Sequence, residues 1–436
     1  MNILPNLIYK YKPISQRLVT SLLPTKTNNS LETITTFLTF SLAILSLLII
    51  VGSTGSQVQQ TISPLVASLN TKLHQTTTAK KQYQVYGYAP YWTFDKLDNV
   101  DFSTLTTLAY FDIKLNADGS LQTDDPGYTT FMSDQATTTF QKAHDAGAKV
   151  NVTVSLMQNN DILAFLDNPQ AQEQASNQII QQVKNRGIDG VSLDVEYAGN
   201  PGADYQKKFT SFVQTFSAKL HSQVPDSQVT VAVYAGSARD QQLYDLGKLA
   251  QSTDAIFMMA YDFATSSAEN AQPTAPLYGY KKGKYPYDVA TAVDDFLKVM
   301  PANKLILGVP YYGYNYPVSQ PEVKSQTLSY WASPAVQTYS IAQENVTAQT
   351  QAAYRSGWDD DAKVSWRAYQ DSATGTWRMI FLEDEKSLGI KYDFAKSKNL
   401  AGVGIWALGF DEGHRELWSL LREKFGTNLA DSRGAL

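Results

Sequence analysis

Short apolar runs alternate with longer amphipathic stretches from residue 84 to residue 426. Strands that alternate with helices favour a parallel sheet, and eight such units predict an α/β fold, a (β/α)8 TIM barrel. The eight apolar runs are 85–92, 105–113, 148–156, 188–196, 228–234, 254–263, 304–313 and 400–408. The amphipathic stretches of helical length are 129–146, 170–186, 205–222, 288–300 and 412–424.

The longest interval between two apolar runs covers residues 314–382, and it is too long for a simple loop. It contains many aromatic residues in strand-like segments. We therefore predict a small α+β insertion after the seventh strand, which forms one wall of a cleft. The predicted barrel domain spans 84–426 with this insertion, and a short tail follows at 427–436.

An uncharged apolar segment at 34–52 lies ahead of the barrel, and a helix of this length just crosses a ~30 Å hydrocarbon layer. Segment 1–33 carries three lysines and one arginine but no acidic residue before Glu32, so the positive-inside rule places it in the cytoplasm. The sequence thus predicts a single N-terminal transmembrane helix that serves as a signal anchor, a stalk at 53–83 and a catalytic domain outside the cytoplasm. The alternative is a signal peptide that is cleaved after the apolar segment, which would release a secreted protein.

Composition narrows the classes of function. The formal net charge is −5, and no basic stripe with interleaved aromatics is present, so nucleic acid is not an expected partner. The chain has no cysteine, which excludes disulfides and thiolate metal sites. The four histidines lack ligand spacing, which argues against a zinc hydrolase or a Ser-His-Asp enzyme. Aromatic residues make up 12% of the chain, which is compatible with stacking against sugars or with an ordinary core. We expect the protein to be a monomer.

The fourth apolar run contains an unusual pair of acids. Over residues 188–197 an apolar residue alternates with a small or acidic one, as in a β-strand. Two side chains that are two residues apart on a strand project from one side, with Cα atoms roughly 6.6 Å apart. Burying charge is costly unless it is paired or useful, so this strand is predicted to hold a functional acid. The residues on this side are Gly190, Ser192, Asp194 and Glu196.

Polar and aromatic residues also stand at the ends of other predicted strands. Glu196 ends the fourth strand, Tyr261 and Asp262 end the sixth, and Trp406 lies near the end of the eighth. The carboxyl ends of barrel strands meet at one face, where the catalytic groups of such barrels sit. The sequence therefore predicts one site at this mouth.

These segments resemble a known family. Residues 189–196 are similar to the D-G-x-D-x-D-x-E signature of family 18 glycoside hydrolases, the chitinases and related N-acetylglucosaminidases. Residues 259–262 resemble the family's M-x-Y-D motif, 307–313 its L-G-x-P-x-Y-G motif and 402–406 its eighth strand. The resemblance extends from 85 to about 425. With the predicted anchor, the chain resembles a membrane-anchored bacterial-type member.

The resemblance implies a mechanism. Members cleave β-1,4 linkages next to N-acetylglucosamine, as in chitin-type oligomers or peptidoglycan, by substrate-assisted retaining catalysis. Glu196 would be the general acid. Asp194 would orient the substrate's acetamide, and its charge would raise the pKa of Glu196. Tyr261 would hydrogen-bond to the acetamide oxygen.

The resemblance also implies how the sugar is held. Trp406 would form the floor under the distorted sugar ring, and Asp262 would line the same subsite. Met259 and Ser192 complete the predicted substrate-binding set. No metal or organic cofactor is implied, and the expected partner is an N-acetylglucosamine-containing polysaccharide or oligosaccharide.

Two departures from the family pattern leave an alternative open. Ser192 stands where the signature has its middle Asp, and it cannot store a charge. The third-strand motif S-x-G-G reads SLMQ at 155–158, which lacks both glycines. The alternative function is a catalytically impaired, chitinase-like sugar-binding protein on the same barrel. A hydrolase that uses two carboxylates directly is disfavoured, because Asp194 and Glu196 are too close to flank a bond.

Overall fold

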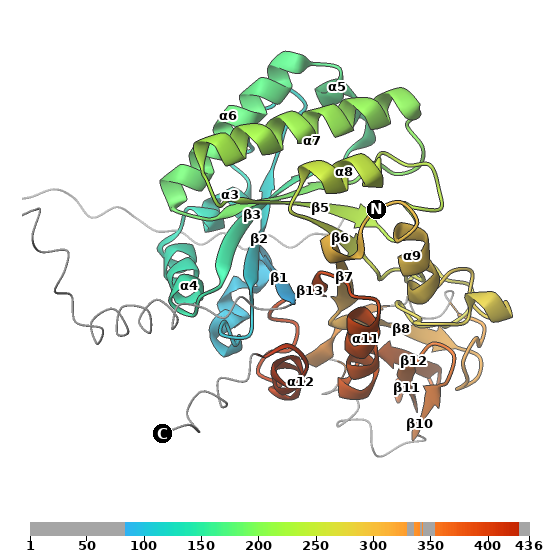
Figure 1. Ribbon diagram of the computed structural model, residues 1–436. Coiled ribbons are helices and arrows are strands. Elements are labelled where there is room, and N and C mark those ends of the chain that lie inside the picture. The colour runs from blue at the N-terminus through green and yellow to red at the C-terminus, as the bar shows by residue number, and fades with distance from the viewer. Residues whose placement is uncertain (1–82, 329–334, 341, 343–353, 427–436) are drawn as a thin grey trace, which may run out of the picture. The chain divides into compact units, whose positions relative to one another are not determined.

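A closed barrel of eight parallel strands lies at the centre of the described part of the computed structural model, residues 83–328, 335–340, 342 and 354–426 (Figure 1). Neighbouring strands follow the order β1-β13-β7-β6-β5-β4-β3-β2. The predicted barrel is therefore confirmed. The strands are β1 (Gln84–Pro90), β2 (Thr107–Lys114), β3 (Lys149–Leu156), β4 (Gly190–Val195), β5 (Gln228–Tyr234), β6 (Ala255–Met259), β7 (Leu305–Pro310) and β13 (Gly402–Trp406).

Helices cover the outside of the barrel (Figure 1). The predicted stretch 129–146 contains parts of two helices, because one ends at Phe131 and Ser133 caps the next by accepting from the N–H of Ala136. Three helices were not predicted, namely α5, α8 and α11. The helices are α3 (Pro126–Phe131), α4 (Asp134–Asp145), α5 (Asn159–Leu166), α6 (Pro169–Arg186), α7 (Ala203–Gln223), α8 (Leu246–Ser252), α9 (Val289–Phe296), α11 (Glu385–Ser397) and α12 (Glu416–Phe425). Short 3₁₀ helices span Tyr91–Asn99, Tyr280–Lys282 and Ala302–Lys304.

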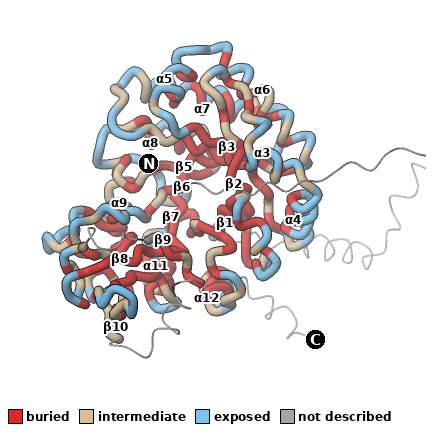
Figure 2. The backbone as a smooth tube through the Cα atoms, turned by 180° about the vertical axis from the view of Figure 1, so that it is seen from behind, coloured by how far each residue is buried: buried red, intermediate tan, exposed pale blue. Residues whose placement is uncertain are grey.

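The barrel strands are buried along nearly their whole length (Figure 2). Their near-continuous apolar runs suit a parallel sheet with both faces covered. At the amino end of β4, Asp189 Oδ2 accepts from the N–H of Val150 and lies 2.7 Å from His144 Nε2. Asp254 and His221 repeat this contact at the start of β6. These carboxylates link the amino-terminal ends of neighbouring strands, at the opposite end of the barrel from the mouth.

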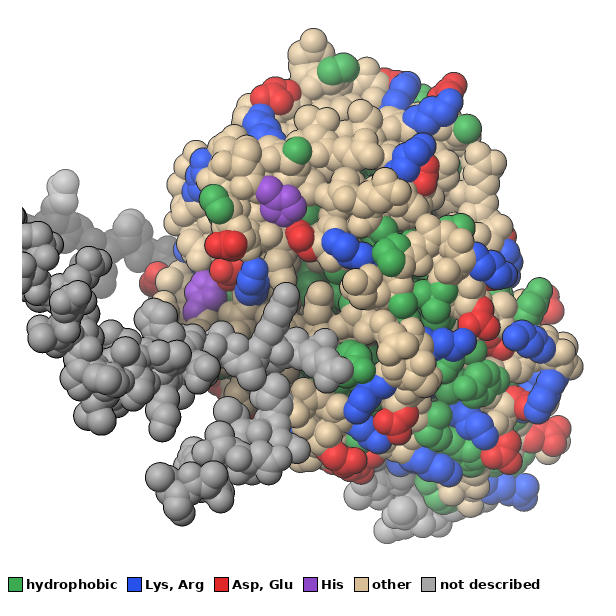
Figure 3. Space-filling view, in the orientation of Figure 1, with side chains coloured by type: hydrophobic (Ala, Val, Ile, Leu, Met, Phe, Trp, Pro, Cys, Tyr) green, Lys and Arg blue, Asp and Glu red, His purple; other side chains and the backbone are tan. Residues whose placement is uncertain are grey.

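The insertion after β7 is an antiparallel sheet of five strands in the described residues, in the order β10-β11-β12-β8-β9. It begins at Tyr312, two residues before the predicted start, because the chain runs almost directly from β7 into β8. Figure 3 shows hydrophobic side chains gathered, among basic and acidic ones, over the part of the molecule that holds α9 and this sheet. The strands are β8 (Tyr312–Val318), β9 (Ala335–Thr338), β10 (Tyr354–Asp359), β11 (Val364–Gln370) and β12 (Trp377–Leu382).

Several predicted segments lie outside the described residues. They are the cytoplasmic segment 1–33, the anchor at 34–52, the tail at 427–436 and all of the stalk except Tyr83. Within the described residues, none of the helices combines the length and the apolar character needed to cross a membrane.

Candidate active site

A cleft of about 690 Å³ opens at the carboxyl ends of the barrel strands. Its volume is typical of a small-molecule site. Six of the seven site residues predicted from the sequence line it, and Ser192 does not. The lining residues are Phe111, Met157, Asp194, Glu196, Tyr234, Ala235, Gly236, Arg239, Met259, Tyr261, Asp262, Phe263, Pro286, Tyr287 and Trp406.

The inward side chains of β4 are increasingly exposed toward the mouth. Ser192 is fully buried, Asp194 is 4% exposed, and Glu196 is partly exposed just past the end of the strand. The backbone N–H of Glu196 still donates to the carbonyl of Leu156 at 3.0 Å, which holds this residue against β3. The alternation of the strand therefore gives a carboxyl pair in which one member lies inside the barrel and the other reaches the cleft.

Burial controls the ionisation of this pair. It raises the pKa of Asp194 well above its usual range, and the nearby charges of Glu196 and Asp112 raise it further. Among the described residues, Asp194 Oδ1 is buried without a hydrogen-bond partner, so a negative charge there is poorly compensated. Burial without a partner therefore favours the protonated form of Asp194.

The pKa of Glu196 is also raised, and again burial is the largest cause. A hydrogen bond with Tyr234 lowers it, and the charge of Asp262 raises it. The sequence suggested that the charge of Asp194 would be the cause. The structure instead gives burial as the largest cause of the shift.

Ser192 lies beneath the cleft and not in it. Its hydroxyl is hydrogen-bonded to the Tyr88 hydroxyl at 2.8 Å, and both side chains are buried. Asp194, two residues nearer the mouth, lies between Ser192 and the cleft. The predicted contact of Ser192 with substrate is therefore corrected to a contact with the barrel interior.

Asp112 on β2 is a third buried carboxyl near the mouth, which the sequence reasoning missed. It is 2% exposed, and its side chain accepts a hydrogen bond from Ser155. Burial raises the pKa of Asp112. An acid inside the apolar run 105–113 was the available signal, since the same pattern drew attention to β4.

Asp262 is held by three hydroxyl groups. Its Oδ1 accepts from Tyr312 at 2.5 Å, from Tyr314 at 2.8 Å and from Thr274 at 3.1 Å. The residue is exposed and has a φ of +56°, so the chain turns away from β6 here. Both tyrosines come from β8, and the first strand of the insertion thereby fixes a carboxylate of the cleft.

Aromatic rings form the other side of the cleft floor. The Trp406 ring contacts Phe111 edge-on, with ring centroids 4.7 Å apart, and Tyr88 at 5.7 Å. Trp92, which the sequence reasoning did not assign, is 49% exposed and lies 6.5 Å from Trp406 between ring centroids. The apolar surface therefore continues beyond the cleft in the direction of β1.

The family model for glycosyl hydrolases family 18 matches residues 84–411. The chain belongs to glycosyl hydrolase family 18. Di-N-acetylchitobiase of Rattus norvegicus is 23% identical over 309 residues, which cover 65% of this chain and 78% of the relative. Chitotriosidase-1 of Mus musculus is 28% identical over 246 residues, which cover 53% of this chain and 51% of the relative.

Solved structures share the fold of this family 18 domain. A group IV chitinase of Ostrinia furnacalis has a TM-score of 0.69 at 21% identity and covers 79% of this chain and 100% of its own. A GH18 chitinase of Cycas revoluta, solved in complex with (GlcNAc)3, has a TM-score of 0.67 at 19% identity over 79% of this chain and 100% of its own. The architecture of the family is therefore present from the first strand to the last.

The family 18 domain keeps the acid of its signature and departs from it deeper in the barrel. Glu196 stands at the mouth, whereas Ser192 replaces the signature's middle Asp and bonds to Tyr88. Met157, in place of the first missing glycine of the third-strand motif, is exposed and lines the cleft. In the described part of the chain, no three His, Asp or Glu side chains are grouped to hold a metal ion.

Proposed function

We propose that this chain is a glycosidase that cleaves β-1,4 linkages next to N-acetylglucosamine, with Glu196 as the general acid. The observation that carries the proposal is the Asp194–Glu196 pair, which lines a cleft at the carboxyl ends of a family 18 barrel. The names of the relatives, chitobiase and chitotriosidase, and the chitin oligomers in related structures support this class of substrate.

The proposed reaction needs one proton from the pair. Glu196 donates this proton to the glycosidic oxygen as the bond to the anomeric carbon breaks, and the carbonyl oxygen of the substrate's own acetamide forms the new bond to that carbon. The Glu196 carboxylate then takes a proton from the water that opens this cyclic intermediate, which restores the acid and retains the configuration.

In this proposal Asp194 accepts a hydrogen bond from the substrate's acetamide. An acetamide N–H that donates to Asp194 would favour its charged form, which is otherwise disfavoured by burial. A charged Asp194 would in turn favour the protonated form of Glu196. Tyr261 would donate to the acetamide oxygen, Trp406 would support the sugar ring, and Asp262 would line the same subsite.

Replacing Glu196 by Gln tests the proposal. We expect turnover of N-acetylglucosamine oligomers, followed by product analysis, to fall about 10²–10⁴-fold, because the acid is lost while the shape is kept. Glu173→Gln on the exposed face of α6 is the matched control and should keep full activity. An unchanged rate in Glu196→Gln, with an unchanged circular dichroism spectrum, would refute the proposal.

Ser192 favours a second candidate, a chitinase-like sugar-binding protein with impaired catalysis. The serine leaves Asp194 without an acid beneath it, and the Tyr88 hydroxyl engages the serine instead. Binding of N-acetylglucosamine oligomers by the wild-type chain without product formation between pH 4 and pH 9 would support this candidate over the enzyme.

We also propose that residues 34–52 anchor the chain in a membrane, with the barrel outside the cytoplasm. The uncharged apolar run after a basic segment supports this location. Secretion after cleavage is the alternative. Fractionation of cells, with protease treatment from outside, should find the barrel in the membrane fraction and accessible, whereas a shortened chain in the medium would refute the anchor.

A further inference from the structure

Arg239 is the only basic residue that lines the cleft in the described part of the chain. It follows β5, on the side of the mouth away from Trp92, and its side chain is 42% exposed. Neither the family motifs nor the proposed hydrolysis uses it. Its guanidinium shares the cleft with three carboxyl groups, those of Asp194, Glu196 and Asp262.

The guanidinium is held on one edge and one face. Nε and Nη2 donate to the two carboxylate oxygens of Asp240, at 2.9 and 2.6 Å. The group lies over the ring of Tyr287, 4.1 Å from its centroid, which is cation–π distance. A guanidinium has five N–H donors in a planar fork, so the edge opposite Asp240 keeps donors that face no partner among the described residues.

Tyr287 is itself fixed. It is buried, its hydroxyl donates to Asp295 at 2.8 Å, and its ring contacts Phe263 and Tyr280. The ring under Arg239 therefore stands at one position. An arginine whose stacking surface and one edge are already satisfied loses little conformational freedom when its free edge binds a ligand.

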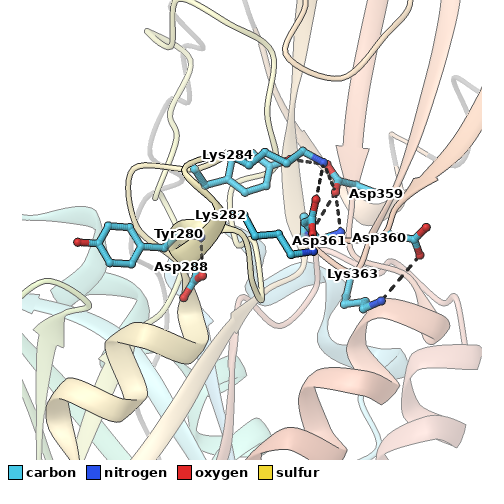
Figure 4. A network of polar contacts seen from close by, with 10 residues as sticks. Tyr280, Lys282, Lys284, Asp288, Asp359, Asp360, Asp361 and Lys363 are labelled. Carbon is cyan, nitrogen blue, oxygen red and sulfur yellow. Dashed lines mark hydrogen bonds and ion pairs between the residues drawn. The ribbon is translucent and has the colours of Figure 1, made fainter.

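The segment that carries Tyr287 is joined to the insertion by a network of charges (Figure 4). Lys284 Nζ donates to Asp359 at 2.7 Å, and Lys282 pairs with Asp361 (Figure 4). The carboxylate of Asp359 is fully buried and also accepts from the N–H groups of Asp361 and Ala362. The insertion thereby holds the loop that carries Tyr287, the ring beneath Arg239.

We infer that Arg239 is a carboxylate-binding subsite, and that the glycan taken by this cleft carries carboxylates. The free edge of the planar guanidinium can donate two parallel hydrogen bonds to the two oxygens of a carboxylate. Chitin-type chains are neutral and offer no such group. Peptidoglycan offers it on its stem peptides, and on the lactyl ether of its second sugar wherever the peptide has been removed. The inference rests on the proposed function, since it requires a glycan in this cleft.

Binding to the inactive Glu196→Gln variant of the full chain tests the subsite without turnover. The probes are soluble peptidoglycan glycan fragments with free carboxylates and the same fragments after carbodiimide amidation. We expect the free acids to bind about tenfold or more tightly, because a hydrogen bond to a charged group is lost on amidation. Added salt should reduce this preference.

Substituting Arg239 in the Glu196→Gln variant should change the preference for free acids over amides, and not only the affinity for both. Arg239→Gln should bring the ratio of the two dissociation constants close to one, and Arg239→Lys should keep only part of it. Arg355→Gln is the matched control, since Arg355 lies over Trp377 at 5.6 Å outside the cleft. This control should leave the ratio unchanged.

The inference is overturned if the starting variant does not prefer the free acids, or if Arg239→Gln keeps the preference. An equal loss for acid and amide also overturns it, because Arg239 would then bind a neutral carbonyl. Turnover by the wild-type chain is measured separately. Tight, Arg239-dependent binding of the acids without any turnover would refute the proposed hydrolysis and support the subsite.

Discussion

The hydroxyl of Tyr234 is one of three influences on the pKa of Glu196, the proposed general acid. Burial raises the pKa of Glu196, the hydrogen bond with Tyr234 lowers it, and the charge of Asp262 raises it. Tyr234→Phe removes only the hydroxyl. The bond that stabilises the Glu196 carboxylate is then lost, so we expect the pKa of Glu196 to rise.

The size of this rise follows from the bond that is removed. A hydrogen bond to a charged group contributes about 1.5–3 kcal/mol, and one pKa unit corresponds to about 1.4 kcal/mol. Glu196 is partly exposed, and water replaces some of the lost bond, so the lower end of this range applies. We expect the change to be about one pH unit.

The assay is the pH dependence of kcat/KM for N-acetylglucosamine oligomers. A general acid must be protonated, so the alkaline limb reports its pKa in the free enzyme. The limb should move upward by about one unit in Tyr234→Phe. Tyr244→Phe is the control, because the Tyr244 hydroxyl donates to the carbonyl of Val195 at 2.8 Å and should leave the limb in place. An unmoved limb, or one displaced downward, would refute the assignment.

Two further predictions concern buried charge. Burial raises the folded-state pKa of Asp194 above its unfolded value near 3.9, so wild-type stability falls as pH rises from that value through the folded pKa. Asp194→Asn should therefore raise Tm at pH 7 but not at pH 3 and should lower kcat about 10²–10³-fold, whereas a lower Tm at pH 7 would contradict this. Lys391 Nζ contacts both oxygens of Glu383 at 2.7 Å inside the protein, so Lys391→Met should lower the free energy of unfolding by about 3–5 kcal/mol. Urea denaturation should show most of this loss recovered in Glu383→Gln/Lys391→Met, and a single-variant loss below about 1 kcal/mol would contradict the burial of the pair.

The barrel could be predicted because its strands are apolar throughout and evenly separated by helical stretches. The ends of the strands could not. The run 254–263 reads as one strand, but β6 ends at Met259 because the chain turns at Asp262 with a φ of +56°. Such a turn depends on the Tyr312 and Tyr314 hydroxyls, which come from a strand 50 residues further on and leave no local pattern.

The site residues divide in the same way. Glu196 and Asp194 were predictable because a strand with period two fixes which side chains share a face. Arg239 and Tyr287 were missed because loop geometry brings them to the mouth, and no local pattern marks them in the sequence. Tyr234 was missed although it ends the predicted strand 228–234, where the rule that identified Glu196 also applies. The cause of the raised pKa of Glu196 could not be predicted from the sequence either. Two neighbouring acids suggest charge repulsion, whereas burial in the barrel is the largest cause.

The position of Ser192 determines how the charge of Asp194 can be compensated. The serine hydroxyl engages Tyr88, and Asp194 Oδ1 is left without a partner among the described residues. No group beneath Asp194 on β4 stores a charge, and burial raises the pKa of Asp194, so its charged form needs compensation from the cleft. Activity in this chain should therefore depend on how well the substrate's acetamide engages Asp194, more than on any acid below it.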